Sequence, residues 1–297
     1  MNKLGDDPRF GDLIRSDVAS AQAGDVVIVG VPTDEGVRRN GGRVGAAQAP
    51  DEIRKYLRKI ALPLSMYGDH QKQIFDHGNI SGATLEEIHD NACAAAATYS
   101  RRGCFVIGLG GGHDVTYPLV KGHREAGAPF GLMNIDAHLD VRQKKNGLHH
   151  SGSSFRLLIE EGIVSGTDFV EFGIQPLAAA KAHADWVTDQ GGHIHYLYAI
   201  QAEAVERNFG IATAALESYY LSFDIDSVRA SDAPGCSAPS PVGFTAEEAL
   251  AMCAIAAASG KLRGFDIVET NPLFDIDGHT SRLAAMMIAT VIASIPQ

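Results

Sequence analysis

The sequence predicts an α/β fold, a three-layer α/β/α sandwich built around a mainly parallel β-sheet. Short apolar runs alternate with longer segments of helical spacing, which is typical of strand–helix–strand units. The apolar runs are nearly continuous, as expected for strands that helices cover on both faces. Hydrophobic residues make up 45% of the 297 residues, and no linker divides them. We therefore expect one domain over residues 1–297, in which residues 1–24 form an N-terminal extension.

The elements follow from local composition. Four segments have the length and spacing of helices, and they cover residues 49–59, 85–99, 246–258 and 281–295. Asp51 and Thr245 are of the residue types that cap helix N-termini, so we expect them to cap the first and third of these helices. Seven runs rich in Val, Ile, Leu, Phe and Tyr are predicted strands, at residues 25–31, 104–109, 131–135, 168–174, 195–198, 219–223 and 264–268.

Charge and cysteine content narrow the class of protein. The formal net charge of −11 argues against a nucleic-acid partner, because phosphate binding requires clustered Lys and Arg. The four cysteines are far apart, so neither a disulfide framework nor a thiolate zinc site is expected. The first residues lack the apolar core of a signal peptide, and no apolar stretch is long enough to span a membrane. We expect a cytoplasmic protein without a membrane partner.

Polar residues follow three of the predicted strands, at the edge of a parallel sheet where ligands bind. Strand 131–135 continues into the sequence DAHLD, strand 219–223 into DID, and strand 104–109 into GGGHD. Residues two apart in extended backbone point the same way, so the side chains of each segment can face one cavity. The candidate metal ligands are His113, Asp136, His138, Asp140, Asp224 and Asp226.

Two imidazoles and four carboxylates form a mixed nitrogen and oxygen ligand set. Oxygen-rich sets suit Mn²⁺ or Mg²⁺, and imidazole favours Mn²⁺ of the two. Four carboxylates also balance the charge of two dications, without which they would repel one another strongly. We expect two Mn²⁺ per chain, which together can turn water into hydroxide for a hydrolysis. The glycine-rich segment 108–112 could alternatively be a dinucleotide-binding loop. This alternative is weaker than the metal site, because His113 stands where the third glycine of that motif belongs.

The segments GGGHD (110–114), DAHLD (136–140) and SFDID (222–226) resemble the three signatures of the arginase/agmatinase (ureohydrolase) family. The resemblance runs from about residue 25 to near the C-terminus, and it implies the arginase-like sandwich and the hydrolysis of a C–N bond in a guanidinium, amidine or formimino group. Glu269 matches a family glutamate that pairs with cationic substrate nitrogens. The resemblance further implies one manganese on His113, Asp136, Asp140 and Asp224, and the other on Asp136, His138, Asp224 and Asp226.

The chain departs from the arginase pattern in one loop. Arginases carry a histidine, regarded as a proton shuttle, just before a glycine, and here Ser151 precedes Gly152. Two alternatives stay open for His150: it takes the shuttle's place by a shift of one residue, or it is a surface-loop histidine. This departure casts doubt on arginase and agmatinase activity.

Arginines beside the metal motifs predict carboxylates at the end of the substrate remote from the reacting carbon, because guanidinium clamps carboxylate through two hydrogen bonds. The segments DEGVRRN (34–40), DAHLDVR (136–142) and SGSSF (151–155) resemble the formimidoylglutamase branch of the family. That resemblance implies that N-formimidoyl-L-glutamate and water give L-glutamate and formamide, a step of histidine degradation. The candidate substrate-binding residues are Arg142, Arg38, Arg39, Arg43 and Ser151.

Several alternatives stay open. Arg38, Arg39 and Arg43 could instead pair with Asp34, Glu35 or Asp51 and brace their loop. The enzyme could be another ureohydrolase (a guanidinobutyrase, agmatinase or arginase) that releases urea, or a non-catalytic metal-binding member of the fold. Family members are often trimers or hexamers, so the resemblance implies a homo-oligomer, while smaller assemblies stay open.

Overall fold

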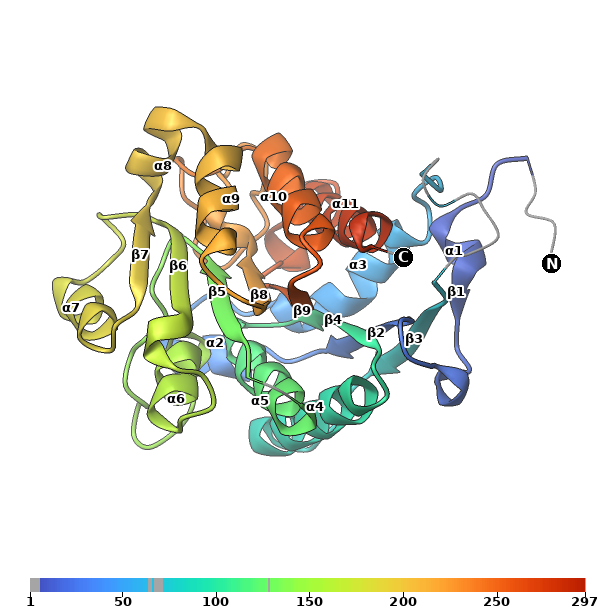
Figure 1. Cartoon of the computed structure of the whole chain (residues 1–297), viewed down its shortest axis with the longest axis horizontal. Coiled ribbons are helices and arrows are strands. Elements are labelled where there is room, and N and C mark those ends of the chain that lie inside the picture. The colour runs from blue at the N-terminus through green and yellow to red at the C-terminus, as the bar shows by residue number, and fades with distance from the viewer. Residues whose placement is uncertain (1–5, 64–65, 67–71, 128, 297) are drawn as a thin grey trace.

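The structure, a computed structural model, describes residues 6–63, 66, 72–127 and 129–296. A nine-stranded sheet lies between two layers of helices (Figure 1), and every pair of neighbouring strands in it is parallel. The predicted three-layer sandwich is confirmed. The strand order is β1-β3-β2-β4-β9-β8-β5-β6-β7, and the strands are β1 (Ile14–Arg15), β2 (Val26–Val31), β3 (Ile74–Asn79), β4 (Phe105–Gly110), β5 (Gly131–Ile135), β6 (Phe169–Ile174), β7 (His193–Tyr196), β8 (Tyr219–Asp224) and β9 (Leu262–Val268).

Helices form separate layers on the two faces of the sheet (Figure 1). One layer contains α3 (Ala49–Leu57), α8 (Leu197–Glu203), α9 (Val205–Ala214), α10 (Ala246–Ala258) and α11 (His279–Ser294). The other contains α4 (Leu85–Arg101), α5 (Thr116–Ala126), α6 (Ser154–Glu160) and α7 (Lys181–Asp189). Two further helices are short. Helix α1 (Phe10–Leu13) is the first element of the chain, and α2 (Glu35–Asn40) is the next element after β2.

The sheet divides the hydrophobic core into two parts. In β2, Val26 and Ile28 pack into the core under α3 and α11, while Val27 and Val29 pack into the core under α4 and α5. This alternation is the period of two that a strand imposes on its side chains. Because both faces are covered, most of the strands are largely apolar, and this is why most of them could be recognised as continuous runs.

Two details differ from the expected elements. The expected strand 195–198 is observed as His193–Tyr196, because Leu197 begins α8. Helix α3 begins at Ala49, two residues before the expected cap Asp51, because Pro50 suits the first turn of a helix. The expected cap Thr245 is confirmed, and its hydroxyl accepts a hydrogen bond from the Glu248 backbone N–H.

Among the residues that the structure describes, no helix is both long and apolar enough to cross a membrane.

Candidate metal centre

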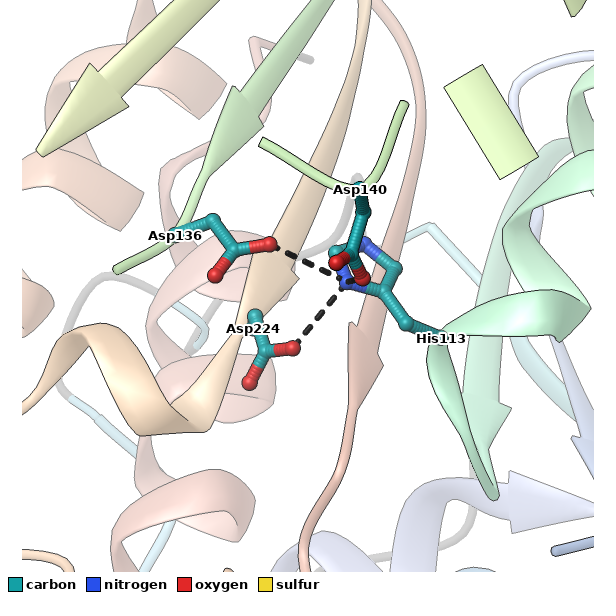
Figure 2. A group of neighbouring side chains, drawn as sticks. All are labelled: His113, Asp136, Asp140 and Asp224. Carbon is teal, nitrogen blue, oxygen red and sulfur yellow. Dashed lines mark ion pairs between the residues drawn. The ribbon is translucent and has the colours of Figure 1, made fainter. Parts of the chain in front are cut away.

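The candidate ligands lie at the carboxyl ends of adjacent central strands. The order β4-β9-β8-β5 places strands that are far apart in the chain side by side, and such a reversal of strand order opens a crevice at the sheet edge. His113 lies in a 3-10 turn after β4, Asp136 directly follows β5, and Asp224 is the last residue of β8. Figure 2 shows how His113, Asp136, Asp140 and Asp224 point toward one another.

The first group surrounds one nitrogen of His113. Its Nδ1 atom lies 3.3 Å from an oxygen of Asp136, 3.2 Å from one of Asp140 and 3.0 Å from one of Asp224. All four ligand atoms are within 4.8 Å of one another (Figure 2). His113, Asp136 and Asp224 are buried, so water cannot screen the charges of the carboxylates. This group has the donors and the spacing to hold a cation.

A second group of donors shares Asp136 with the first. His138 Nδ1 lies 3.4 Å from the other oxygen of Asp136 and 3.2 Å from an oxygen of Asp226. Asp136, His138 and Asp226 together form the second potential cation site. The structure therefore brings all six candidate ligands together, with Asp136 between the two sites. Asp224 has its ligand oxygen in the first group, and its other oxygen accepts a hydrogen bond from the Asp226 backbone N–H at 2.8 Å.

The ligands of each segment converge because the chain turns after the strand. The expectation that extended backbone would direct residues two apart into one cavity was wrong. Asp136 and Asp224 each accept a hydrogen bond from the backbone N–H two residues later, those of His138 and Asp226. Such a turn reverses the chain locally and fixes one oxygen of each carboxylate. Asp140 has a φ of +43°, a left-handed conformation that few residues other than glycine adopt. The strained conformation directs its carboxylate back toward His113.

Hydrogen bonds on the far side of the His113 ring select the tautomer that binds metal. Ser222 donates its hydroxyl hydrogen to Asp266, at an Oγ–Oδ1 distance of 2.7 Å. The same Oγ lies 3.0 Å from His113 Nε2, so it accepts the Nε2 hydrogen. In the neutral ring, Nδ1 then carries a lone pair directed at three carboxylates, and it has no hydrogen-bond partner in the described part of the chain. A metal ion satisfies both the lone pair and the carboxylates.

The charges of the cluster also require cations. Burial and the neighbouring charges of Asp226 and Asp136 raise the pKa of Asp224 well above its usual range. The negative charge of Asp226 raises the pKa of His138, against the opposing effect of burial. In both shifts the negative charge of neighbouring buried carboxylates favours the protonated form when no metal balances that charge. The donor set therefore fits two divalent ions.

Glu269 lies beside the cluster and has one oxygen committed to it. Its Oε1 accepts the backbone N–H of His113 at 2.8 Å, whereas Oε2 has no partner among the described residues. Glu269 has a φ of +62°, and its own N–H donates to the carbonyl of Gly111. Burial raises the pKa of Glu269 to about 8. A strained, buried carboxyl group with an unused oxygen is typical of a functional residue.

A cavity of about 340 Å³ joins the metal cluster to the expected substrate-binding residues. Arg142 and Arg43 lie in its wall, so two cations face a cavity whose base is acidic. Arg43 is held in place by the backbone carbonyls of Cys236 and Ser237 and stacks on the Phe274 ring at 4.2 Å. The lining also includes Asn40, His138, Asp140, Ser151, Asp224, Asp226 and Glu269.

Arg38 and Arg39 do not line this cavity. Arg38 is exposed and pairs with Glu35 on the same helix. Arg39 is largely buried, pairs with Glu35 and Glu86, and donates to the backbone carbonyl of His149. The structure thus places both guanidinium groups as braces, which was the alternative to substrate binding.

His150 is held within its loop, and its role as a proton shuttle stays a prediction. Its Nδ1 accepts the N–H of Gly152 at 3.2 Å, so its Nε2 carries the hydrogen, which it donates to the carbonyl of Gln143 at 3.0 Å. The side chain is buried and does not line the cavity. Both ring nitrogens are therefore committed to the fold of the loop.

Two residues of the site were not assigned from the sequence. Asn40 lines the cavity from the end of α2, and Asp266 holds Ser222 beneath His113. A signal existed for Asp266, because a carboxylate within an apolar strand requires buried partners. No comparable signal existed for Asn40, whose partners lie about a hundred residues further along the chain.

Comparisons with known proteins agree with this geometry. A model of the arginase family matches residues 24–293. Formimidoylglutamase of Rhodococcus jostii is 33% identical over 295 residues, covering 92% of this chain and 86% of that protein. The Streptococcus pyogenes formimidoylglutamase is 32% identical over 300 residues, covering 97% and 90%. The crystal structure of Trypanosoma cruzi formiminoglutamase with Mn²⁺ superposes with a TM-score of 0.92 at 35% identity, covering 98% of this chain and 100% of that chain.

Proposed function

The chain belongs to the arginase family, and we propose that it is a binuclear-manganese hydrolase of N-formimidoyl-L-glutamate. Water and this substrate give L-glutamate and formamide, as the C–N bond between the formimino carbon and the glutamate nitrogen breaks. The observation that carries the proposal is the single cavity that contains both the acidic cluster and Arg142. We also propose that the enzyme works in the cytoplasm, in histidine degradation.

We assign the six clustered residues as ligands of two manganese ions. His113, Asp136, Asp140 and Asp224 would hold one ion, and Asp136, His138 and Asp226 would hold the other. The family resemblance implies that Asp224 would also contribute to the second ion. Manganese is supported by the Trypanosoma cruzi relative, whose crystal structure contains Mn²⁺. When bound, the ions supply Lewis-acid chemistry that lowers the pKa of water toward neutrality and stabilises the negative charge developing during attack.

The chain's own residues orient the substrate. We assign Glu269 Oε2 to the cationic formimino nitrogens, because its partner oxygen is fixed by the His113 N–H and Oε2 is left unused. Arg142 would clamp a carboxylate of the glutamate end, and Arg43 adds a second positive charge to the same wall. Together they hold the scissile bond between the acidic base of the cavity and its basic wall.

The decisive assay is product identity with purified, Mn²⁺-loaded protein. We expect formamide and L-glutamate from N-formimidoyl-L-glutamate, and no urea from arginine, agmatine or 4-guanidinobutyrate. Urea release from a guanidino compound, with no turnover of the formimino compound, would replace this proposal by a urea-releasing member of the family. Two manganese ions per chain without hydrolysis of either class would indicate a non-catalytic member.

A further inference from the structure

Asn40 is positioned to orient Arg142, although the two residues are far apart in the sequence. The Arg142 Nη1 atom donates a hydrogen bond to Asn40 Oδ1 at 3.1 Å, and Asn40 Nδ2 donates to Ser151 Oγ at 3.1 Å. The two hydrogen bonds define which end of the amide faces the guanidinium. Asn40 is the last residue of α2, so the helix fixes its backbone.

Gly152 provides the space in which these side chains meet. A Cβ atom at Gly152 would lie 3.0 Å from Asn40 Nδ2 and 3.1 Å from Arg142 Cδ. These distances are shorter than ordinary contacts, so any larger residue would displace one of the two side chains. The Gly152 carbonyl also accepts the Arg142 backbone N–H at 2.8 Å. The φ and ψ of Gly152 are −85° and 17°, which residues other than glycine adopt readily, so its small size is the feature that matters.

Arg142 differs from the other arginines near the site in its partners. Arg38 and Arg39 are neutralised by carboxylates, and Arg43 is held by two backbone carbonyls. Within the described part of the chain, the only side chain bonded to Arg142 is the neutral amide of Asn40. A neutral acceptor fixes the direction of the guanidinium and leaves its positive charge available.

We propose that Asn40, with the space left by Gly152, is a positioning residue that presents Arg142 to a substrate carboxylate and thereby sets the preference for an acidic substrate. This inference rests on the proposed function and extends it to residues that do not themselves react. It requires the residue at position 40 to be both a hydrogen-bond acceptor and uncharged.

The test compares Asn40→Ala and the nearly isosteric Asn40→Asp in the Mn²⁺-loaded enzyme, with N-formimidoyl-L-glutamate as substrate. We expect Asn40→Ala to raise KM about tenfold while kcat stays within about threefold. The lost hydrogen bond positions Arg142 for substrate binding, so its loss should weaken binding and leave the chemical step nearly unchanged. Asn40→Asp should raise KM further, roughly 100-fold, because its carboxylate would neutralise Arg142 and compete with the substrate. Inhibition by L-glutamate should weaken in the same order.

The order of the two variants separates positioning from packing. If Asn40 only filled space, the isosteric aspartate would restore KM, and that result would overturn the inference, as would an unchanged KM in Asn40→Ala. Asn208→Ala is the matched control, because Asn208, in α9, is a half-buried asparagine that donates from Nδ2 to the backbone carbonyls of Ile200 and Ala204. A wild-type enzyme that releases no formamide would refute the proposed function itself, which is a separate outcome.

Gly152→Ala tests the same inference from the other side. The added methyl group should displace Arg142 or Asn40 and raise KM by about tenfold without backbone strain. Gly210→Ala is its control, because a Cβ at Gly210 has no neighbour within 4 Å. A Gly152→Ala enzyme with wild-type KM would show that the position of Arg142 does not depend on this contact and would overturn the proposal.

Discussion

His113 shows how a single side chain can require a metal. One nitrogen of its ring is committed to Ser222, and the other is directed at three carboxylates with no proton donor between them. In the absence of metal, these carboxylates raise the pKa of His113 against the opposing effect of burial, so the ring becomes a cation. The same positions are therefore occupied either by protons or by manganese, and metal affinity should fall as pH falls.

Replacing His113 should empty one site and spare the other. His113→Ala removes the only nitrogen donor of the first group, while Asp136, His138 and Asp226 remain. We expect the manganese content to fall from about two ions toward one per chain, and kcat/KM to fall by at least about 100-fold. Metal analysis of the dialysed protein measures the first effect. Retention of two ions with full activity would contradict the ligand assignment.

The hydroxyl of Ser222 should matter although it binds no metal. Ser222→Ala leaves the Nε2 hydrogen of His113 without its acceptor in a buried region, and it removes the shorter of the two hydroxyl hydrogen bonds to Asp266 Oδ1, the other coming from Thr116. We expect about 10- to 100-fold weaker manganese binding, measured by calorimetric titration of the metal-free protein. Thr213→Ala removes another buried hydroxyl, in α9, and should leave the affinity unchanged. Equal affinities for wild type and Ser222→Ala would show that the ring is oriented by other contacts.

At the scale of elements, the features that could be predicted are those with a local cause. Helix-covered strands are largely apolar, and the ligands lie at or just after the ends of β4, β5 and β8, so both could be recognised from composition and spacing. Strand β3 was missed because only its first two residues are buried. The left-handed turn at Asp140 and the contact of Asn40 with Arg142 were missed because tertiary packing determines them, and the sequence carries no local signal for either.

Arg39 joins three elements and should act through stability. It pairs with Glu35 within α2, links α2 to α4 through Glu86, and reaches the loop before Ser151 through the carbonyl of His149. Arg39→Ala should lower the free energy of unfolding by about 1–2 kcal/mol, because two part-buried hydrogen bonds of a charged group are lost together with the exposed ones to Glu86. Urea unfolding measures this loss, and Lys145→Ala is an exposed comparison on the same loop. Unchanged stability together with a raised KM would instead favour the substrate-binding alternative for Arg39.

For the whole molecule, the metal centre joins the ends of β4, β5 and β8 in the middle of the sheet. Removing manganese leaves four carboxylates that repel one another, so the metal should stabilise the entire fold. At a free Mn²⁺ concentration of 100 times Kd, mass action predicts about 2.7 kcal/mol per independent site. Melting temperatures in Mn²⁺ and in EDTA should differ by several degrees, with a smaller difference at low pH, where protons replace the metal. Identical melting temperatures at neutral pH would contradict a bound metal pair.

A second pH effect should arise at His123 in α5, which is not one of the predicted metal ligands. Its ring is buried beside Tyr220, and its Nδ1 hydrogen is donated to the carbonyl of Leu119. Burial lowers the pKa of His123 from its ordinary value of 6.5 to about 4. As pH falls below 6.5, His123 becomes protonated in the unfolded chain but stays neutral in the folded chain until about pH 4. The stability that is present above pH 6.5 is therefore lost progressively between pH 6.5 and about pH 4.

The full loss attributable to His123 is about 3 kcal/mol, and about 2 kcal/mol of it should have occurred at pH 5. His123→Phe keeps a ring against Tyr220 but cannot titrate, so its stability should fall less on acidification. Urea unfolding at pH 7.5 and pH 5.0, both in EDTA, isolates this difference, because the metal cluster and the buried His149 contribute equally to both proteins. Lower absolute stability of the variant at both pH values would not affect the comparison. Equal losses in the two proteins would show that His123 is protonated in the folded state.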